Sequence, residues 1–110
     1  MPNHQVKLDR IFHALSDSTR MAVVTRLSSG PAGASELAKP FKMALPSFTQ
    51  HLGVLESCGL VSSKKAGRVR TYYLIPESLR AAQTWLKTQR KAWKKRLDQL
   101  DNYLLTLKEK

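Results

Sequence analysis

The chain has 110 residues, one cysteine and a formal net charge of +11, from 19 lysines and arginines against 8 aspartates and glutamates. This length supports a single domain with a modest core, one cysteine excludes a disulfide within the chain, and the positive charge favours polyanionic partners, nucleic acid first and a membrane surface second. Because no stretch approaches the roughly 20 apolar residues of a membrane-spanning helix, and the N-terminus lacks a signal-peptide apolar region, we expect no membrane insertion and a cytoplasmic location.

Two amphipathic helices are predicted before residue 30. The apolar positions of the first are Val6, Leu8, Ile11, Phe12 and Leu15. Asp17 or Ser16 can cap the second helix, because a short polar side chain there accepts a hydrogen bond from a free backbone N–H of the first turn. The apolar positions of this second helix are Met21, Val24 and Leu27, and Arg20 lies in its first turn. The loop residues 28–31 then end it.

A short helix follows at residues 36–38, and a turn leads from it into a longer helix. Ser35 is the expected cap of the short helix, and Pro40 ends or bends it. Phe41 and Met43 are expected to fill the core. Two helices joined by a tight turn in this way form a helix-turn-helix.

The longer helix, within residues 44–60, is the segment around which the rest of the chain is organised. Phe48, Leu52 and Leu55 recur at helical spacing and predict one buried stripe. Outside that stripe, the first turns carry polar side chains whose short or planar hydrogen-bonding groups can reach the edges of bases. These side chains are Ser47, Thr49, Gln50 and His51. In a very basic chain this pattern predicts a recognition helix. An ordinary amphipathic helix with a solvated polar face is the alternative, as is a packing role for His51.

From residue 61 the pattern changes to a period of two, which predicts a β-hairpin with strands at 61–66 and 69–75. The basic residues of this hairpin are Lys64, Lys65, Arg68 and Arg70. Because the hairpin follows the recognition helix and has a basic tip, we expect a wing that contacts nucleic acid. The alternative is a solvated hairpin whose cations only keep the sheet edge soluble.

One long helix is predicted from residue 76 onward, because Pro76 suits a helix start and no breaker follows. Its seam consists of Leu79, Ala82, Leu86, Gln89, Trp93, Leu97, Leu100, Leu104 and Leu107, and Trp85 widens the apolar face. The mean spacing of about 3.5 residues predicts pairing with another helix. One small domain cannot cover a helix of roughly 45 Å, at about 1.5 Å per residue, so we expect a second copy of the chain to cover it. A helix lying wholly across its own core is the alternative.

No catalytic or metal-binding pattern is recognised in the sequence. His4, His13 and His51 have no cysteine or carboxylate at ligand or triad spacing, and no glycine-rich phosphate loop occurs. We therefore expect neither an enzyme nor a bound metal or cofactor. A metal site built by His4 and His13 with residues of a second chain is the remaining alternative. Cys58 is expected to be a buried, inert thiol rather than a reactive one.

Three segments of the chain read LSDSTRMAVVTRL, SELAKPFKMALPSFTQHLGVLESCGLV and GRVRTYYLIP. Together they resemble the ArsR/SmtB family of winged helix-turn-helix transcriptional regulators, from about Leu8 to Pro76. Residues 17–20 resemble the family's second-helix signature, and residues 47–52 resemble its Ser-x-His-Leu recognition helix, with Thr49 in the serine position. The long last helix resembles the family's dimerisation helix. The resemblance implies a dimer that represses transcription from operator DNA.

The sequence departs from the metal sensors of that family. Those sensors carry cysteines in the helix before the turn, or His and Asp ligands on the last helix, whereas residues 35–41 hold no cysteine and residues 78–110 hold no histidine. The resemblance is therefore greatest to the SdpR-like branch without metal sites, and it implies no particular inducer. Leu45 stands where the family commonly has glutamine, so one base contact is lost or replaced by an apolar contact with a thymine methyl.

These features predict a mainly α fold with a small β-hairpin. Residues 1–77 form a winged helix-turn-helix, and residues 78–110 form a long dimerisation helix of the same domain. We expect a homodimeric repressor that binds an inverted-repeat operator in double-stranded DNA. A protein-interaction module pairing through the last helix, and charge-driven non-specific nucleic-acid binding, are the alternatives. The predicted DNA-binding residues are Arg20, Leu45, Ser47, Thr49, Gln50, His51, Lys64, Arg68 and Arg70. The predicted dimer-interface residues are Leu8, Phe12, Trp85, Leu86, Trp93, Leu97, Leu100 and Leu104.

Overall fold

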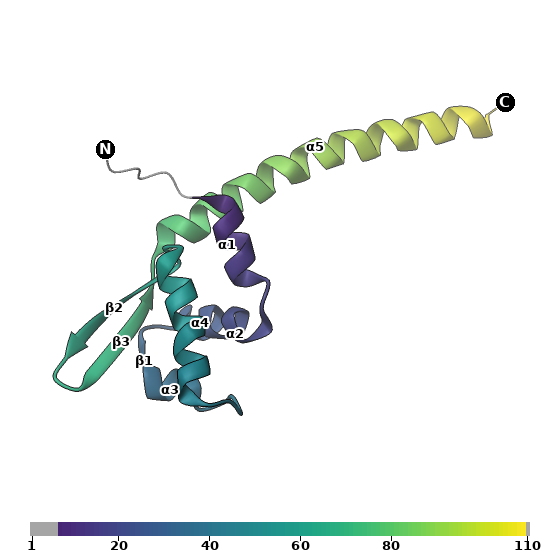
Figure 1. Cartoon of the computed structure of the whole chain (residues 1–110). Helices are drawn as coiled ribbons and strands as arrows, with labels where there is room; N and C mark the ends of the chain where they lie inside the picture. The colour runs from purple at the N-terminus through teal and green to yellow at the C-terminus, as the bar shows by residue number, and fades with distance from the viewer. Residues whose placement is uncertain (1–6, 110) are drawn as a thin grey trace.

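The computed structural model describes residues 7–109, so the predictions for His4 and Val6 lie outside the described residues. The fold is mainly helical, with a small antiparallel sheet and a long C-terminal helix (Figure 1). In chain order the elements are α1 (Leu8–Leu15), α2 (Ser18–Leu27), β1 (Ala32–Gly33), α3 (Ala34–Ala38), α4 (Leu45–Ser57), β2 (Val61–Ala66), β3 (Val69–Leu74) and α5 (Pro76–Lys108). The predicted winged helix-turn-helix with a long last helix is confirmed.

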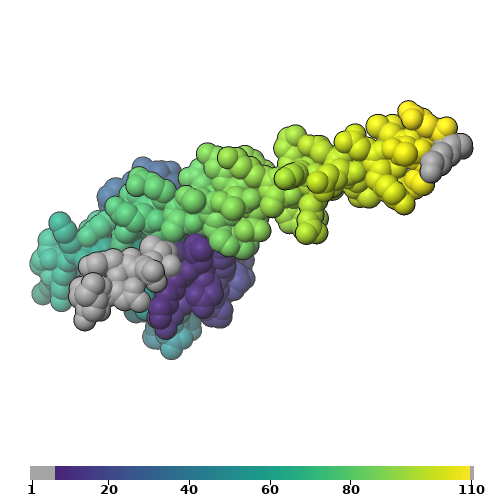
Figure 2. Space-filling view, turned by 90° about the horizontal axis from the view of Figure 1, so that it is seen from above, coloured from purple at the N-terminus to yellow at the C-terminus, as the bar shows by residue number. Residues whose placement is uncertain are grey.

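The first four helices and the sheet form one body, from which α5 projects (Figure 1). The distal part of α5 stands clear of that body (Figure 2), and the molecule measures 73 × 40 × 22 Å along its principal axes. Only Ser78 and Ala82 of α5 are buried. The alternative in which the last helix lies wholly across its own core is therefore wrong. In the described part of the chain, no helix combines the length and apolar character needed to cross a membrane.

The core lies where α1, α2 and α4 meet the base of the sheet. Its largest fully buried side chains are Phe48, Ile11, Leu52, Leu55, Leu60, Val23 and Val61. Three of these belong to α4, which makes that helix the centre of the packing. Burial of a side chain of this size stabilises the fold by about 1.5–3 kcal/mol relative to leaving it exposed.

The predicted apolar face of α2 is partly wrong. Val23, Val24 and Leu27 are buried, whereas Met21 is 55% exposed. The three buried residues lie close together on the helix at 3.6 residues per turn, and Met21 lies about a third of a turn from their centre. Asp17 caps this helix as predicted, because its side chain accepts a hydrogen bond from the backbone N–H of Arg20.

The helix-turn-helix consists of α3, a turn and α4, but its predicted cap is wrong. Gly33 occupies the N-cap position of α3 without a side-chain hydrogen bond, and Ser35 lies inside the helix. The reason is that Gly33 ends β1 and pairs with β3, so the helix begins directly after the strand. In the turn, Phe41 stacks on Phe48 with ring centroids 5.4 Å apart. Met43 remains 36% exposed and does not fill the core as predicted.

The sheet has the strand order β1-β3-β2, and all pairs are antiparallel. The hairpin of β2 and β3 turns at Gly67, whose φ of +63° is a conformation that glycine adopts without strain. Val61 and Tyr72 near the base of the hairpin are buried, whereas its tip is exposed. The two-residue strand β1 was not predicted, because it is too short to show an alternating pattern.

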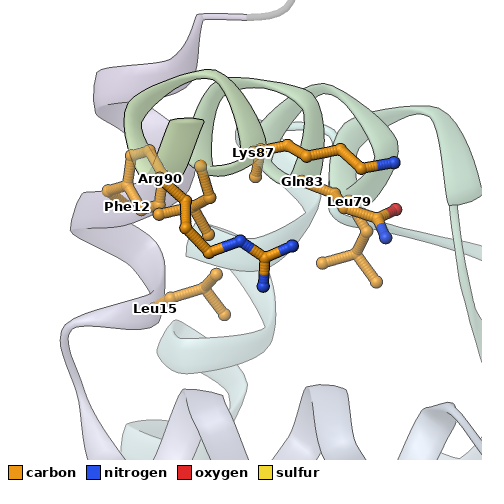
Figure 3. A pocket seen from close by; sticks show the side chains of 8 residues that line it. Phe12, Leu15, Leu79, Gln83, Lys87 and Arg90 are labelled. Atoms are coloured by element: carbon orange, nitrogen blue, oxygen red, sulfur yellow. The ribbon is translucent and has the colours of Figure 1, made fainter. Parts of the chain in front are cut away.

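The proximal part of α5 packs on α1. Phe12 of α1 meets Trp85 of α5 edge to face, with ring centroids 5.5 Å apart. An apolar groove of about 350 Å³ lies between the two helices and is lined by Phe12, Leu15, Leu79, Ala82, Gln83, Leu86, Lys87 and Arg90 (Figure 3). Beyond this groove the seam side chains are about half exposed: Trp93 63%, Leu97 52%, Leu100 50% and Leu104 47%. The single chain therefore buries Ala82 at the start of the predicted seam and leaves the seam beyond the groove uncovered.

Candidate nucleic-acid interface

The N-terminal part of α4 presents exposed side chains at the end of the molecule far from α5 (Figure 1). Pro46 lies in its first turn, where a missing backbone N–H leaves no helical hydrogen bond unmade. Ser47, Thr49 and Gln50 are exposed, and Leu45 is 60% exposed. Because the other face of α4 is buried, these four side chains are held outward by the packing of the helix itself.

The Thr49 hydroxyl is engaged within α4. Its Oγ1 donates a hydrogen bond of 2.9 Å to the carbonyl oxygen of Leu45. This type of bond to the residue four positions earlier is common for threonine in helices. It occupies the hydroxyl proton, so the side chain offers solvent a methyl group and an acceptor oxygen. Gln50 and Ser47 are then the side chains of this face that can donate.

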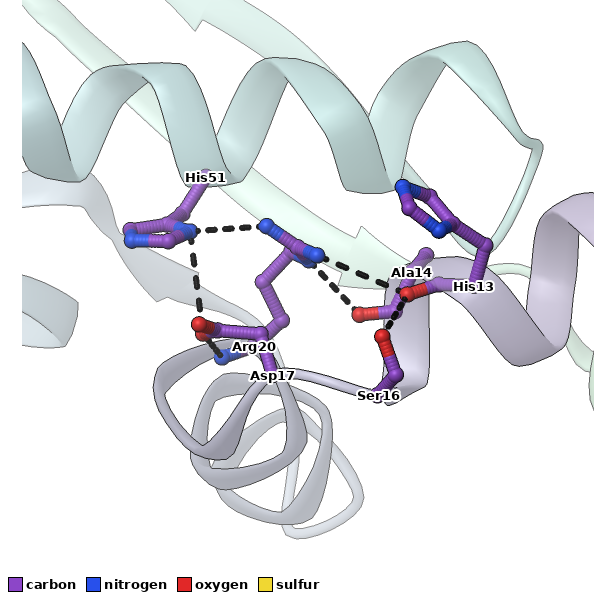
Figure 4. Close-up of polar contacts among 6 residues, drawn as sticks. All are labelled: His13, Ala14, Ser16, Asp17, Arg20 and His51. Carbon is purple, nitrogen blue, oxygen red and sulfur yellow. Dashed lines mark hydrogen bonds and ion pairs between the residues drawn. The ribbon is translucent and has the colours of Figure 1, made fainter.

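His51 lies at the junction of α1, α2 and α4 rather than on the open polar face (Figure 4). Its Nδ1 is 3.0 Å from Nη1 of Arg20 and 3.7 Å from Oδ2 of Asp17. Arg20 also donates from Nε to the Ala14 carbonyl oxygen at 2.6 Å and from Nη2 to that of His13 at 3.5 Å. The structure thus brings together Arg20 and His51, two predicted DNA-binding residues, and places their side chains in contact with each other.

The carboxyl group of Asp17 has a lowered pKa at this junction. The main cause is the hydrogen bond from the backbone N–H of Arg20, at 3.0 Å. Desolvation opposes the shift, and the positive charge of Arg20 adds to it. Asp17 therefore acts both as the cap of α2 and as the negative group beside the imidazole.

The wing is joined to α4 by a chain of polar contacts. Arg70 donates from Nη1 to Oγ of Ser63 at 2.9 Å, and Ser63 donates to Oε2 of Glu56 at 3.0 Å. Desolvation raises the pKa of Tyr72, and the negative charge of Glu56 adds to that shift. Sequence reasoning missed Ser63 and Glu56, because they lie on different elements and match no motif. Lys64 and Arg68 are exposed on the same hairpin.

A second cavity, of about 450 Å³, lies between α1 and the C-terminal part of α4. It is lined by Asp9, Arg10, His13, Val54, Ser57 and Cys58. Cys58 is half-buried rather than fully buried, and its Sγ donates to the Leu55 carbonyl oxygen at 3.4 Å. Among residues 7–109, no three His, Cys, Asp or Glu side chains gather as a metal site requires.

Comparisons with known proteins agree with this geometry. Residues 15–63 match the model of a helix-turn-helix domain family. The chain is 43% identical over 76 residues to the HTH-type transcriptional regulator Rv2034 of Mycobacterium tuberculosis, covering 69% of this chain and 71% of that protein. It is 28% identical over 79 residues to the transcriptional repressor SdpR of Bacillus subtilis, covering 72% and 88%. A solved ArsR family transcriptional regulator superposes with a TM-score of 0.75 at 52% identity, covering 79% of this chain and 96% of that one.

Replacing Asp17 by Asn is expected to flatten the acid dependence of stability. Because the folded-state pKa of Asp17 lies below the ordinary value of 3.8, its carboxylate stabilises the folded chain above that value. This stabilisation is lost as the pH falls through the lowered folded-state pKa. Asn keeps a capping side chain without the charge.

The measurement is urea unfolding between about pH 6 and about pH 2, at one protomer concentration. The free energy of unfolding should fall more steeply with acid in the unaltered protein than in Asp17→Asn. The same change at the exposed Asp9 controls for the loss of one negative charge. Parallel curves for the unaltered protein and Asp17→Asn would contradict the assignment.

Proposed function

We propose that this chain, which belongs to the ArsR family of winged helix-turn-helix transcriptional regulators, is a homodimeric repressor. It would bind an inverted-repeat operator. Its relatives are transcriptional regulators rather than enzymes. The observation that carries the proposal is α4, a helix with one buried face and an uncharged polar face exposed at its N-terminus. Residues 1–77 would read DNA and residues 78–110 would join two copies. The site of action is then the compartment that holds the operator, which in a bacterial cell is the cytoplasm.

Each α4 would enter a major groove with its N-terminal residues toward the bases. The Gln50 amide can donate to N7 and accept from N6 of adenine at the same time. Leu45 and the methyl group of Thr49 suit contact with the methyl group of thymine, and the Ser47 hydroxyl can pair with several bases. This set of side chains favours A·T pairs at the contacted positions.

The wing would contact the sugar-phosphate backbone beside the groove. Lys64 and Arg68 are exposed on the hairpin, and Arg70 is held in place by Ser63. Positive side chains at such positions orient a protein on the duplex without reading sequence. The net charge of +11 supports the same role. That charge also favours the second candidate function, non-specific binding of nucleic acid.

A second copy of the chain would cover the exposed seam of α5. A continuous apolar stripe of tryptophan and leucine on a soluble chain indicates an interaction surface. Trp85 and Leu86 extend this stripe toward α1, whose Leu8 and Phe12 are partly buried against the core. A two-fold axis places the same surface on both partners. It also makes the two recognition helices symmetric, which is what an inverted repeat requires.

Selection of genomic DNA fragments by the purified chain tests this function directly. With excess sheared duplex as competitor, we expect enrichment of an inverted repeat whose half-sites lie about 34 Å apart or a multiple of that distance. Inserting about half a helical turn between the half-sites should abolish tight binding. Binding that depends only on fragment length, with no enriched sequence, would instead support charge-driven binding.

Gln50→Ala and Arg68→Ala are expected to weaken DNA binding in different ways. Loss of the Gln50 amide should cost about 1–3 kcal/mol on the operator and relax base preference at one position per half-site. Loss of the Arg68 charge should weaken specific and non-specific binding alike, and reduce the slope of log affinity against log salt by about one. Lys91→Ala, on the opposite face of α5 from the seam, is the charge-matched control. A changed salt slope in Gln50→Ala, or a changed base preference in Arg68→Ala, would reverse the assigned roles.

Leu97→Glu combined with Leu100→Glu is expected to separate the two copies, because two carboxylates would lie in the apolar seam. Sedimentation should show monomers or insoluble chains. Lys91→Glu with Lys95→Glu places the same two carboxylates on the basic face of α5 and should leave the dimer intact. If the Leu97 and Leu100 variant remains a stable dimer, the seam is assigned wrongly. If the unaltered chain is a monomer, the protein-interaction alternative gains support.

A further inference from the structure

Arg20 is held by backbone groups of a different helix. Its Nε donates to the carbonyl oxygen of Ala14 at 2.6 Å, and its Nη2 lies 3.5 Å from that of His13. Both carbonyl groups belong to the last turn of α1, and that of His13 also accepts from the backbone N–H of Ser16 at 3.1 Å and from Oγ of Ser16 at 2.6 Å. Two of the three guanidinium nitrogens of Arg20 are therefore directed toward α1 (Figure 4).

The third guanidinium nitrogen of Arg20 determines which ring nitrogen of His51 carries the proton. Nη1 of Arg20 lies 3.0 Å from Nδ1 of His51. A guanidinium group has five N–H donors and no acceptor, so Nδ1 must accept and carries no proton. In a neutral imidazole the single proton then lies on Nε2. The Asp17 carboxylate, 3.7 Å from Nδ1, is too far away to take a hydrogen bond from it.

The free nitrogen of His51 lies on the side of the ring away from Arg20 (Figure 4). The side chain is 23% exposed, and it projects from the border of the polar face of α4, about 100° around the helix from Gln50. A donor at the border of a recognition helix faces the sugar-phosphate backbone that lines the groove, rather than the base edges.

We propose that Arg20 is a positioning residue that fixes His51 with its proton on Nε2, so that the ring donates to a phosphate oxygen of bound DNA. This inference rests on the proposed function. It differs from the sequence prediction for Arg20, which placed the guanidinium itself on DNA. Because the same side chain holds the end of α1, Arg20 also sets the position of α4 relative to α1.

Nitrogen NMR of the imidazole in the DNA-free protein tests the first step. The shifts of Nδ1 and Nε2 should show one neutral tautomer, with the proton on Nε2 of His51. In Arg20→Lys and Arg20→Gln the ring should populate both tautomers, because a lysine ammonium cannot span the three acceptors that the planar guanidinium reaches. A proton on Nδ1 in the unaltered protein, or an unchanged single tautomer in both variants, would overturn the proposal. This readout needs no DNA, so it stands even if the proposed operator binding fails.

Operator affinity across a salt series tests the second step. Arg20→Lys, which keeps the charge, should lose on the order of tenfold in specific affinity, and Arg20→Gln should lose a similar factor with an unchanged salt slope. If Arg20 contacts a phosphate itself, Arg20→Lys should bind almost as well as the unaltered protein, and Arg20→Gln should show a slope reduced by about one. That pattern would overturn the proposal.

Two substitutions at His51 provide the matched control and do not alter Arg20. His51→Asn keeps an acceptor near the Nδ1 position but has no donor at Nε2, whereas His51→Gln can place a donor near Nε2. We expect His51→Gln to retain more operator affinity than His51→Asn, although His51→Asn should be the more stable to urea. Circular dichroism confirms folding of every variant. If the Arg20 variants do not fold, the ring tautomer of the unaltered protein and the operator affinities of the two His51 variants still test the proposal. Tighter operator binding by His51→Asn than by His51→Gln would contradict it.

Discussion

Burial of Phe48, Leu52 and Leu55 on one face of α4 is the constraint on which the rest of the structure depends. All three are at most 1% exposed. With 3.6 residues per turn, fixing one face of a helix also fixes which residues point away from the core. Gln50 and its neighbours are exposed for that reason and not through any contact of their own. An exposed surface built this way can change its side chains with little effect on the fold.

Half of the acidic side chains of the chain contribute to internal contacts. Of the 8 carboxylates in the sequence, Asp17, Glu36, Glu56 and Asp98 each accept a hydrogen bond from another residue. Asp17 and Glu56 lie where α4 meets α2 and the wing, so they orient groups beside the proposed DNA surface. The exposed lysines and arginines of the wing face solvent with few acids near them. The surplus positive charge is consequently presented outward, where it can attract a polyanion.

Long periodic elements could be predicted from the sequence, whereas contacts between elements could not. The stripe of α4, the hairpin and the seam of α5 each repeat over many residues, and the structure confirms the two helices and the hairpin that carry them. Ser35 as a cap and Met21 as a core residue were wrong, because the pairing of Gly33 with β3 and the rotation of α2 depend on distant parts of the chain. The contact of Arg20 with His51 spans 31 positions in the sequence. Both residues belong to motifs, but no spacing rule indicates that they meet each other.

Under the proposed function, the small number of bases that α4 can read and the exposed distal seam of α5 explain each other. Gln50 is the one exposed side chain at the start of α4 with a bidentate amide, and such a pair discriminates by about 1–3 kcal/mol. Selecting an operator against genomic DNA takes about 4–10 kcal/mol. In the proposed complex, the bidentate pair of one Gln50 falls below most of that range, whereas two copies of α4 joined in a dimer would add their contributions. A chain that reads few bases per helix therefore needs a firm dimer, and a long apolar helix exposed beyond its own core is suited to form one.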